Sequence, residues 1–253
     1  MGPILEVRRL TKAFGGLTAV NGLDFDVREG EILGVIGPNG AGKSTTFNLI
    51  AGTYPASAGE IFFRGESILG MPPHRIAARG VLRTFQHNRP FGGMPVIDNV
   101  LVGAHTGFPL NPFSSRSRRE EDVKRRQAAE LIDFVGLSGL AQADVGALSF
   151  GQGRLLEIAR ALAGEPKLIL LDEPAAGLTP AELERLAGII RGIAARGIAV
   201  LLIEHDMHFL LPLAQRVVVL NFGAKIADAL PAEIRADPAV MDAYLGSHHA
   251  VPR

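Results

Sequence analysis

The chain has 253 residues, 47% of them hydrophobic, which is enough to bury one large core and excludes a disordered or fibrous protein. Lys and Arg together number 26, as do Asp and Glu, so the formal net charge is zero and no overall positive field would attract nucleic acid. The absence of cysteine excludes disulfides, thiolate metal sites and a cysteine nucleophile, and favours a cytoplasmic protein. No apolar run reaches the length of a membrane span of about 18 residues.

Hydrophobic patterning predicts strands in two groups. Residues 4–8 and 23–28 alternate apolar and polar side chains, which predicts half-buried antiparallel strands. Residues 31–36, 168–171 and 199–203 are short, continuously apolar runs, which are typical of buried parallel strands. The predicted fold class is therefore α/β.

A helical segment interrupts this strand pattern. The pattern stops between about residues 87 and 163, and the spacing of apolar residues predicts amphipathic helices over 122–135 and 152–163. We therefore expect a helical subdomain inserted into the α/β core.

The last third of the chain returns to strands and helices. Residues 180–195 have helical spacing, with Thr179 as the predicted N-cap. Residues 216–226 are typical of a β-hairpin. We expect one domain over residues 1–236, followed by a short C-terminal helix and tail over residues 237–253.

A glycine-rich segment predicts phosphate binding. It matches G-x-x-x-x-G-K-[ST], follows an apolar strand and opens a helix, as a P-loop does, although a glycine-rich turn without phosphate chemistry is the alternative. Backbone N–H groups would turn toward phosphate oxygens, Lys43 would bridge the β and γ phosphates, and the Ser44 hydroxyl would bind Mg²⁺. The predicted nucleotide-binding residues here are Gly37, Pro38, Asn39, Gly40, Ala41, Gly42, Lys43, Ser44 and Thr45.

Two carboxylates end the apolar run at residues 168–171. Charge at the end of a buried strand is unfavourable unless a cation or a reaction uses it. The segment is typical of a Walker B strand, in which Asp172 would hold Mg²⁺ and Glu173 would act as the general base for the attacking water. Taken alone, the same segment could be an ordinary turn.

Residues 148–152, Leu-Ser-Phe-Gly-Gln, resemble the LSGGQ signature motif of the ATP-binding cassette (ABC) ATPases. The resemblance implies that Ser149, Gly151 and Gln152 offer donors to the γ-phosphate of a nucleotide held by a second subunit. Phe150 departs from the family pattern, which has a small residue there. A capped helix without a chemical role is the alternative.

Other family positions follow the same order along the chain. Phe14 corresponds to the aromatic residue that stacks on adenine, with a core phenylalanine as the alternative. Gln86 corresponds to the Q-loop glutamine, which senses Mg²⁺ and the γ-phosphate. His205 corresponds to the switch histidine, which contacts the γ-phosphate. Residues 175–179 occupy the D-loop, with Thr179 where many members have Asp.

The resemblance implies an ABC ATPase fold, which is a P-loop NTPase core with an antiparallel β edge subdomain and a helical insertion. Residues 83–86, 203–207 and 243–246 also resemble the ATP-binding subunit of branched-chain amino acid importers. Relatives that transport urea, short amides or lipopolysaccharide share several of these sequence segments. The implied ligands are ATP and Mg²⁺. The implied partners are a second copy or a sister ATPase subunit, and an integral membrane permease that would hold the chain on the inner face of the cell membrane.

A soluble ABC ATPase acting on nucleic acid or the ribosome is the alternative from another functional class. Such relatives typically join two cassettes or carry a long coiled coil, whereas this chain has room for one cassette and shows no heptad run. Zero net charge also argues against nucleic acid, so no nucleic-acid partner is expected.

Overall fold

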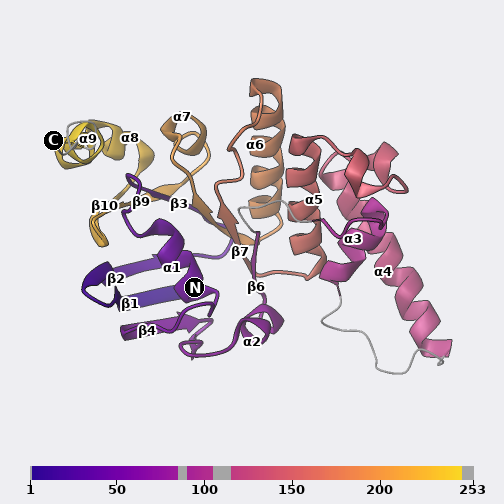
Figure 1. Ribbon diagram of the computed structural model, residues 1–253, viewed down its shortest axis with the longest axis horizontal. Helices are drawn as coiled ribbons and strands as arrows, with labels where there is room; N and C mark the ends of the chain where they lie inside the picture. The colour runs from indigo at the N-terminus through magenta and orange to yellow at the C-terminus, as the bar shows by residue number, and fades with distance from the viewer. Residues whose placement is uncertain (1, 85–89, 105–114, 247–253) are drawn as a thin grey trace.

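The computed structural model describes residues 2–84, 90–104 and 115–246, which form two β-sheets with helices around them (Figure 1). The strands are β1 (Leu5–Phe14), β2 (Leu17–Val27), β3 (Ile32–Ile36), β4 (Ala58–Phe63), β5 (Glu66–Ser67), β6 (Val81–Arg83), β7 (Leu168–Asp172), β8 (Ala199–Ile203), β9 (Arg216–Asn221) and β10 (Ala224–Ala229). The α-helices are α1 (Lys43–Ile50), α2 (Pro73–Ala78), α3 (Val96–Gly103), α4 (Ser115–Phe134), α5 (Phe150–Ala163), α6 (Pro180–Ala195), α7 (Met207–Leu210), α8 (Pro231–Ala236) and α9 (Pro238–Gly246).

The larger sheet carries the predicted parallel strands. In the described residues its order is β10-β9-β3-β8-β7-β6, and neighbouring strands are parallel except for the β9–β10 hairpin. Every residue of β3, β7 and β8 is buried, because both faces of the sheet are covered. The predictions for 31–36, 168–171 and 199–203 are thus confirmed. The predicted hairpin is also confirmed, and its first strand extends the central sheet beside β3.

The smaller sheet is antiparallel, in the order β2-β1-β4-β5. The predicted strands at 4–8 and 23–28 lie in β1 and β2, but the observed strands are longer, reaching Phe14 and starting at Leu17. The pairing of β1 with β2 contains register shifts, the first between Val7 and Leu10. A bulge breaks the strict alternation on which the prediction depended, which explains why the strands were predicted too short.

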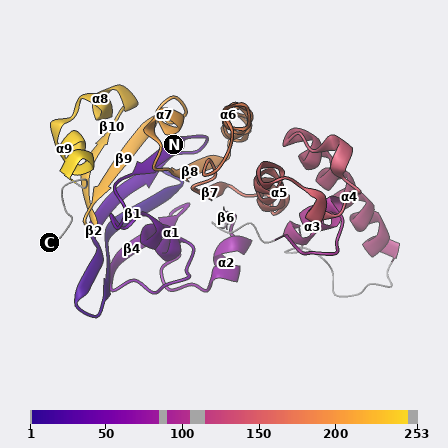
Figure 2. The same cartoon turned by 45° about the horizontal axis from the view of Figure 1, so that its top comes forward.

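Helix α1 lies between the two sheets (Figure 1), where Phe47 and Ile50 are fully buried in one apolar cluster. The opposite face of the larger sheet is covered by a second cluster, to which α5 and α6 contribute (Figure 2). Because α1 is packed on both sides, the loop that precedes it is held against the ends of the central strands.

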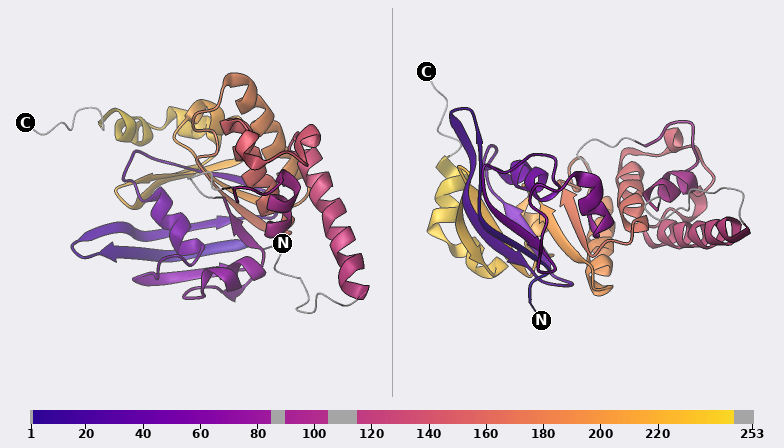
Figure 3. Two further views of the ribbon diagram at one scale, coloured as in Figure 1. Left: turned by 45° about the vertical axis from the view of Figure 1, so that its right-hand side comes forward. Right: turned by 90° about the horizontal axis from the view of Figure 1, so that it is seen from below.

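The helices α3, α4 and α5 pack against one another at one end of the molecule, away from the antiparallel sheet (Figure 3). Helix α5 covers the segment predicted at 152–163, and α4 covers the segment predicted at 122–135 except for residue 135. Helix α6 confirms the prediction for 180–195, and the side chain of Thr179 accepts a hydrogen bond from the N–H of Glu182 as its N-cap. No helix in the described ranges is long and apolar enough to cross a membrane.

Candidate functional site

The predicted P-loop joins β3 to α1. Gly42 is the N-cap of α1 with φ of 99°, and a methyl group added to it would lie 2.4 Å from the carbonyl oxygen of Ala19 on β2. Only glycine tolerates both this left-handed backbone and this close approach. The N–H and Oγ1 of Thr46 both donate to the Gly42 carbonyl (2.9 and 3.0 Å), which fixes the first turn of the helix.

A cavity of about 520 Å³ opens beside the N-terminus of α1. Residues 39–45 form one wall, Phe14, Leu17 and Ala19 of the smaller sheet form another, and Glu173 closes the space. Peptide N–H groups at a helix N-terminus attract anions, and an aromatic wall suits a flat ring. The cavity therefore combines the two environments that a nucleotide requires.

Lys43 is buried at the base of this cavity, with 6% of its surface exposed. Its Nζ donates hydrogen bonds to the carbonyl oxygens of Gly37 (2.7 Å) and Pro38 (3.0 Å). Burial lowers the pKa of Lys43, and the negative charges of Glu173 and Asp172 oppose that shift. An ammonium group held by neutral carbonyls at a helix N-terminus suits an anionic ligand such as a phosphate.

Asp172 ends β7 and is bound by an arginine that sequence reasoning gave no role. Arg83 Nη2 donates to Asp172 Oδ2 (2.7 Å), and Arg83 Nη1 donates to Asn48 Oδ1 on α1 (2.6 Å). The Asp172 side chain is completely buried and that of Arg83 is 13% exposed. The signal in the sequence was the buried carboxylate itself, because such a group needs a counter-charge.

The second oxygen of Asp172, Oδ1, is buried and has no hydrogen-bond partner among the described residues. An unsatisfied carboxylate oxygen in a buried position is unfavourable unless it meets a cation or water. Ser44 places its hydroxyl in the wall of the nucleotide-sized cavity. Carboxylate and hydroxyl oxygens are hard ligands that suit Mg²⁺, so the chemistry of Asp172 and Ser44 agrees with the predicted metal, but Asp172 is not among the described residues that line the cavity.

Glu173 lies just beyond β7, and its side chain lines the cavity. Its backbone has φ of 47°, which is rare for a residue other than glycine. The turn is held by a hydrogen bond from its N–H to the carbonyl oxygen of Ile203 on β8 (3.0 Å). Strained backbone of this type concentrates at functional sites, where it directs a side chain toward its target.

Phe14 is not a core residue, because 43% of its surface is exposed and it lines the cavity. Its ring makes an edge-to-face contact with Tyr54, with centroids 5.6 Å apart. Lys12 Nζ lies 4.8 Å from the ring centroid. The exposure of Phe14 argues against the core alternative, and these contacts orient the ring for which stacking on adenine is predicted.

The signature residues lie at the start of α5. Ser149 Oγ accepts a hydrogen bond from the N–H of Gln152 (3.2 Å), and Gln152 Oε1 accepts one from the N–H of Ser149 (2.8 Å), which is a complete capping box. None of Ser149, Gly151 and Gln152 is among the described residues that line the P-loop cavity. Within one chain the structure does not bring the two predicted phosphate sites together.

His205 follows β8 and has a side chain that is 58% exposed, with Nδ1 3.9 Å from Oε2 of Glu204. Glu204, which sequence reasoning missed, is fully buried, and its Oε1 accepts a hydrogen bond from the N–H of Ala175 in the D-loop (2.8 Å). Burial, reinforced by the charges of Glu173 and Asp206, raises the pKa of Glu204 to about 7. The predicted Q-loop residue Gln86 lies outside the described residues.

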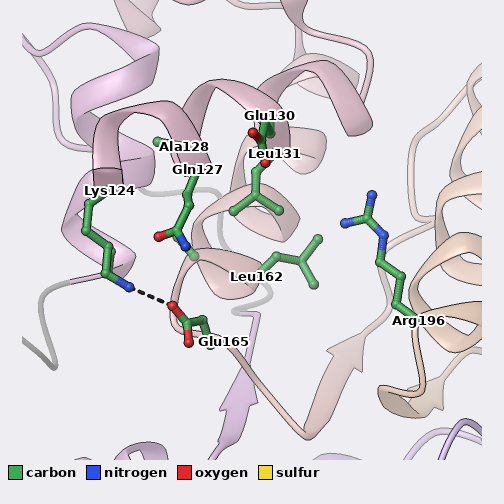
Figure 4. Close-up of a pocket in the computed structure, with 10 residues that line it drawn as sticks. Lys124, Gln127, Ala128, Glu130, Leu131, Leu162, Glu165 and Arg196 are labelled. Carbon is green, nitrogen blue, oxygen red and sulfur yellow. Dashed lines mark hydrogen bonds and ion pairs between the residues drawn. The ribbon is translucent and has the colours of Figure 1, made fainter. Parts of the chain in front are cut away.

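A second cavity, of about 310 Å³, lies between α4, the end of α5 and the end of α6 (Figure 4). Lys124 Nζ and Glu165 Oε1 form an ion pair of 2.6 Å at one side, and Arg196 lies across from them. No residue of the predicted P-loop, signature or Walker B segments lines it. The candidate chemistry is therefore concentrated in the cavity beside α1.

Three features define a P-loop nucleotide-binding protein. The P-loop follows the central parallel strand β3, the buried Asp172 ends β7 of the same sheet, and Glu173 lines the cavity beside the loop. Comparison with known proteins refines this class. A family model described as "ABC transporter" matches residues 20–176, and a model described as "Branched-chain amino acid ATP-binding cassette transporter" matches residues 224–250.

Curated relatives match over nearly the full length. The chain is 44% identical to the high-affinity branched-chain amino acid transport ATP-binding protein BraF of Pseudomonas aeruginosa, covering 96% of this chain and 98% of that protein. It is 40% identical to LivG of Escherichia coli with the same coverage. The solved structure of the ADP conformation of MJ1267, an ATP-binding cassette of an ABC transporter, matches with a TM-score of 0.86, 33% identity, and 97% and 100% coverage of the two chains.

The chain belongs to the ABC transporter family, and it is an ATP-binding, ATP-hydrolysing cassette with the ABC ATPase fold. The predicted fold class and enzyme class are thereby confirmed.

Proposed function

We propose that this chain energises an importer of branched-chain amino acids by hydrolysing ATP beside a separate membrane permease. The observation that carries the proposal is the match of residues 224–250 to the branched-chain amino acid cassette model, because that segment lies outside the part matched by the general ABC model. The names of BraF and LivG support the same assignment.

The P-loop cavity is the proposed nucleotide site. Lys43 and the backbone N–H groups of residues 39–44 bind the β and γ phosphates, and the ring of Phe14 stacks on adenine. Ser44 and Asp172 hold Mg²⁺, which supplies positive charge to the phosphate oxygens when bound. Residues 39–45 of the predicted loop line this wall, whereas Gly37 and Pro38 hold Lys43 Nζ through their carbonyl oxygens.

We assign the hydrolytic step to Glu173 and His205, which follow β7 and β8, and to Gln86. Glu173 orients the attacking water and accepts its proton, since its strained backbone directs the carboxylate into the cavity. His205 contacts the γ-phosphate, and Gln86 senses both Mg²⁺ and the γ-phosphate, as in the resembled family.

A second subunit completes the site. Because Ser149, Gly151 and Gln152 do not line the cavity of their own chain, we assign them to the γ-phosphate of a partner in a head-to-tail dimer. The N-terminus of α5 favours an anion through its free N–H groups and its dipole. The partner is a second copy or a sister ATPase subunit.

The proposed organisation is one ABC domain over residues 1–236, with a helical subdomain at about 87–163, followed by a C-terminal helix and tail over 237–253. In cells we place the chain in the cytoplasm, on the inner face of the membrane through its permease. No nucleic-acid partner is included, because the formal net charge is zero.

Uptake of labelled solutes by cells that lack this chain tests the proposal. We expect deletion to abolish high-affinity uptake of leucine, the wild-type chain to restore it, and Glu173→Gln to fail although it is produced at the same level. Uptake of urea and of acetamide serves as the matched control and should not change. Unchanged leucine uptake with lost urea or acetamide uptake would contradict the proposed solute class.

A further inference from the structure

The two positions at which this chain departs from the ABC pattern, Phe150 and Thr179, lie close together in the fold. Helices α5 and α6 run side by side in two views (Figures 1 and 2), and each of the two residues stands at the start of its helix. The signature motif, residues 148–152, therefore adjoins the D-loop, residues 175–179, within one chain.

Phe150 packs on the D-loop. A methyl group added to Gly177 would lie 3.1 Å from Cε1 of the Phe150 ring, and Gly177 has φ of 77°, so the ring covers backbone that has no side chain of its own. The Cζ of Arg154 lies 5.2 Å from the ring centroid, and Arg154 is ion-paired with the buried Glu157 (3.4 Å). The ring is thus held in place, yet 54% of the surface of Phe150 remains exposed.

Thr179 provides a second connection through Glu182. The N–H and the hydroxyl of Thr179 both donate to Glu182 Oε2, at 2.9 and 2.8 Å. The other oxygen, Oε1, lies against the signature motif, since a methyl group added to Gly151 would be 2.2 Å from it. The side chain of an aspartate in place of Thr179 could not donate to Glu182 and would repel its carboxylate, which leaves only the backbone N–H as a donor.

We propose that Phe150 and the Thr179–Glu182 pair lock the signature motif to the D-loop of the same chain, so that both motifs meet the partner subunit as one surface. The exposed part of the Phe150 ring is the apolar centre of that surface, and the partner that binds the surface is a second cassette. The proposal deepens the proposed function and rests on ATP-dependent pairing. Phe150 and Thr179 are positioning residues, because they act through the motifs that they hold.

Hydrogen exchange on the single chain without nucleotide tests the lock itself. We expect Phe150→Ala to accelerate exchange of the amides of residues 175–179 by roughly fivefold, because the ring no longer covers the D-loop. Phe150→Tyr should preserve the protection. Phe91→Ala is the matched control, because Phe91 is also exposed and also faces an arginine of α5. The Phe91 ring centroid lies 5.6 Å from Cζ of Arg160. Unchanged exchange in Phe150→Ala overturns the inference, whatever the pairing behaviour.

Light scattering with ATP in a Glu173→Gln background tests how the lock is used. We expect Phe150→Ala and Thr179→Asp each to weaken ATP-dependent pairing roughly tenfold, with single-chain ATP affinity within about twofold of the parent, since neither residue lines the cavity. In the double variant the affinity of ATP-dependent pairing should fall by at most about twentyfold, whereas independent effects would lower it about a hundredfold. Additive losses overturn a shared lock.

Failure of the proposed head-to-tail pairing and failure of the contact within the chain give different results. A Glu173→Gln parent that stays monomeric with ATP overturns the proposed head-to-tail pairing and the role of the surface in it. In that case accelerated D-loop exchange in Phe150→Ala would still support the contact within the chain.

Discussion

Replacing the buried Glu204 by glutamine should flatten the dependence of stability on pH. The Glu204 side chain is fully buried at the end of β8, and burial raises its pKa from 4.5 to about 7. In the unfolded chain the carboxyl is ionised above about pH 4.5, whereas in the folded chain it keeps its proton until about pH 7. The contribution of this group to stability is therefore complete below about pH 4.5, and it is lost as the pH rises from there through about 7.

The magnitude follows from proton linkage. Between pH 6 and pH 8 a group with a pKa of about 7 falls from about 90% to about 10% protonated in the folded state, while the unfolded state binds almost no proton. Integrating this difference gives a loss of about 1.4 kcal/mol in the free energy of unfolding over the two pH units. Glu204→Gln carries no titratable group, so the variant lacks this loss.

Urea denaturation of both proteins at pH 6, 7 and 8, in metal-free buffer, measures the effect. The neighbouring titratable groups, Glu173, His205 and Asp206, are common to both proteins, so their contributions largely cancel in the comparison. Glu182→Gln is the matched control, because Glu182 is only partly buried and its hydrogen bonds with Thr179 lower its pKa away from this range. Parallel pH profiles for wild type and Glu204→Gln, within about 0.5 kcal/mol, would refute the assignment of a buried proton to Glu204.

Local sequence was sufficient for the P-loop and the Walker B strand. In both cases the functional residues lie next to a short apolar run, so neighbouring positions alone identify the motif. The capped helix after Thr179 was predictable for the same reason, because a capping box involves residues only three positions apart.

Two of the strands that the sequence analysis missed have weak signals. β6 has three residues at the edge of the larger sheet, and β4 contains a glycine, Gly59, at φ of 97°, which is atypical of a strand. Neither strand has the apolar periodicity over several residues from which a strand is predicted. Their pairing with β7 and β1 is set by tertiary contacts.

The partners of the buried carboxylates were not predictable, because they come from distant parts of the chain. Arg83 lies 89 positions from Asp172, and Ala175 lies 29 positions from Glu204. The contact of Phe150 with Gly177 belongs to the same class, since it joins the start of α5 to the D-loop that precedes α6, 27 positions away. From the sequence, the two departures from the family pattern were separate irregularities. In the fold they lie in one contact region, which is the physical reason to treat them together.

Substitutions at three further residues test the site. Lys43→Ala should weaken ATP binding by at least about tenfold in equilibrium titration, because the phosphates lose a buried counter-charge; unchanged affinity would contradict the P-loop assignment. Glu173→Gln should retain ATP binding while steady-state phosphate release falls by roughly 10²–10⁴-fold, and near-normal turnover would exclude it as the base. Arg83→Gln should destabilise the fold by about 3–5 kcal/mol in urea, because it leaves the completely buried carboxylate of Asp172 without its cation. Arg83→Lys keeps the charge but cannot hold Asp172 and Asn48 together, so a smaller loss is expected. An equal loss of stability in the two arginine variants would show that the two simultaneous hydrogen bonds of the guanidinium group, and not its charge, hold Asp172 in place.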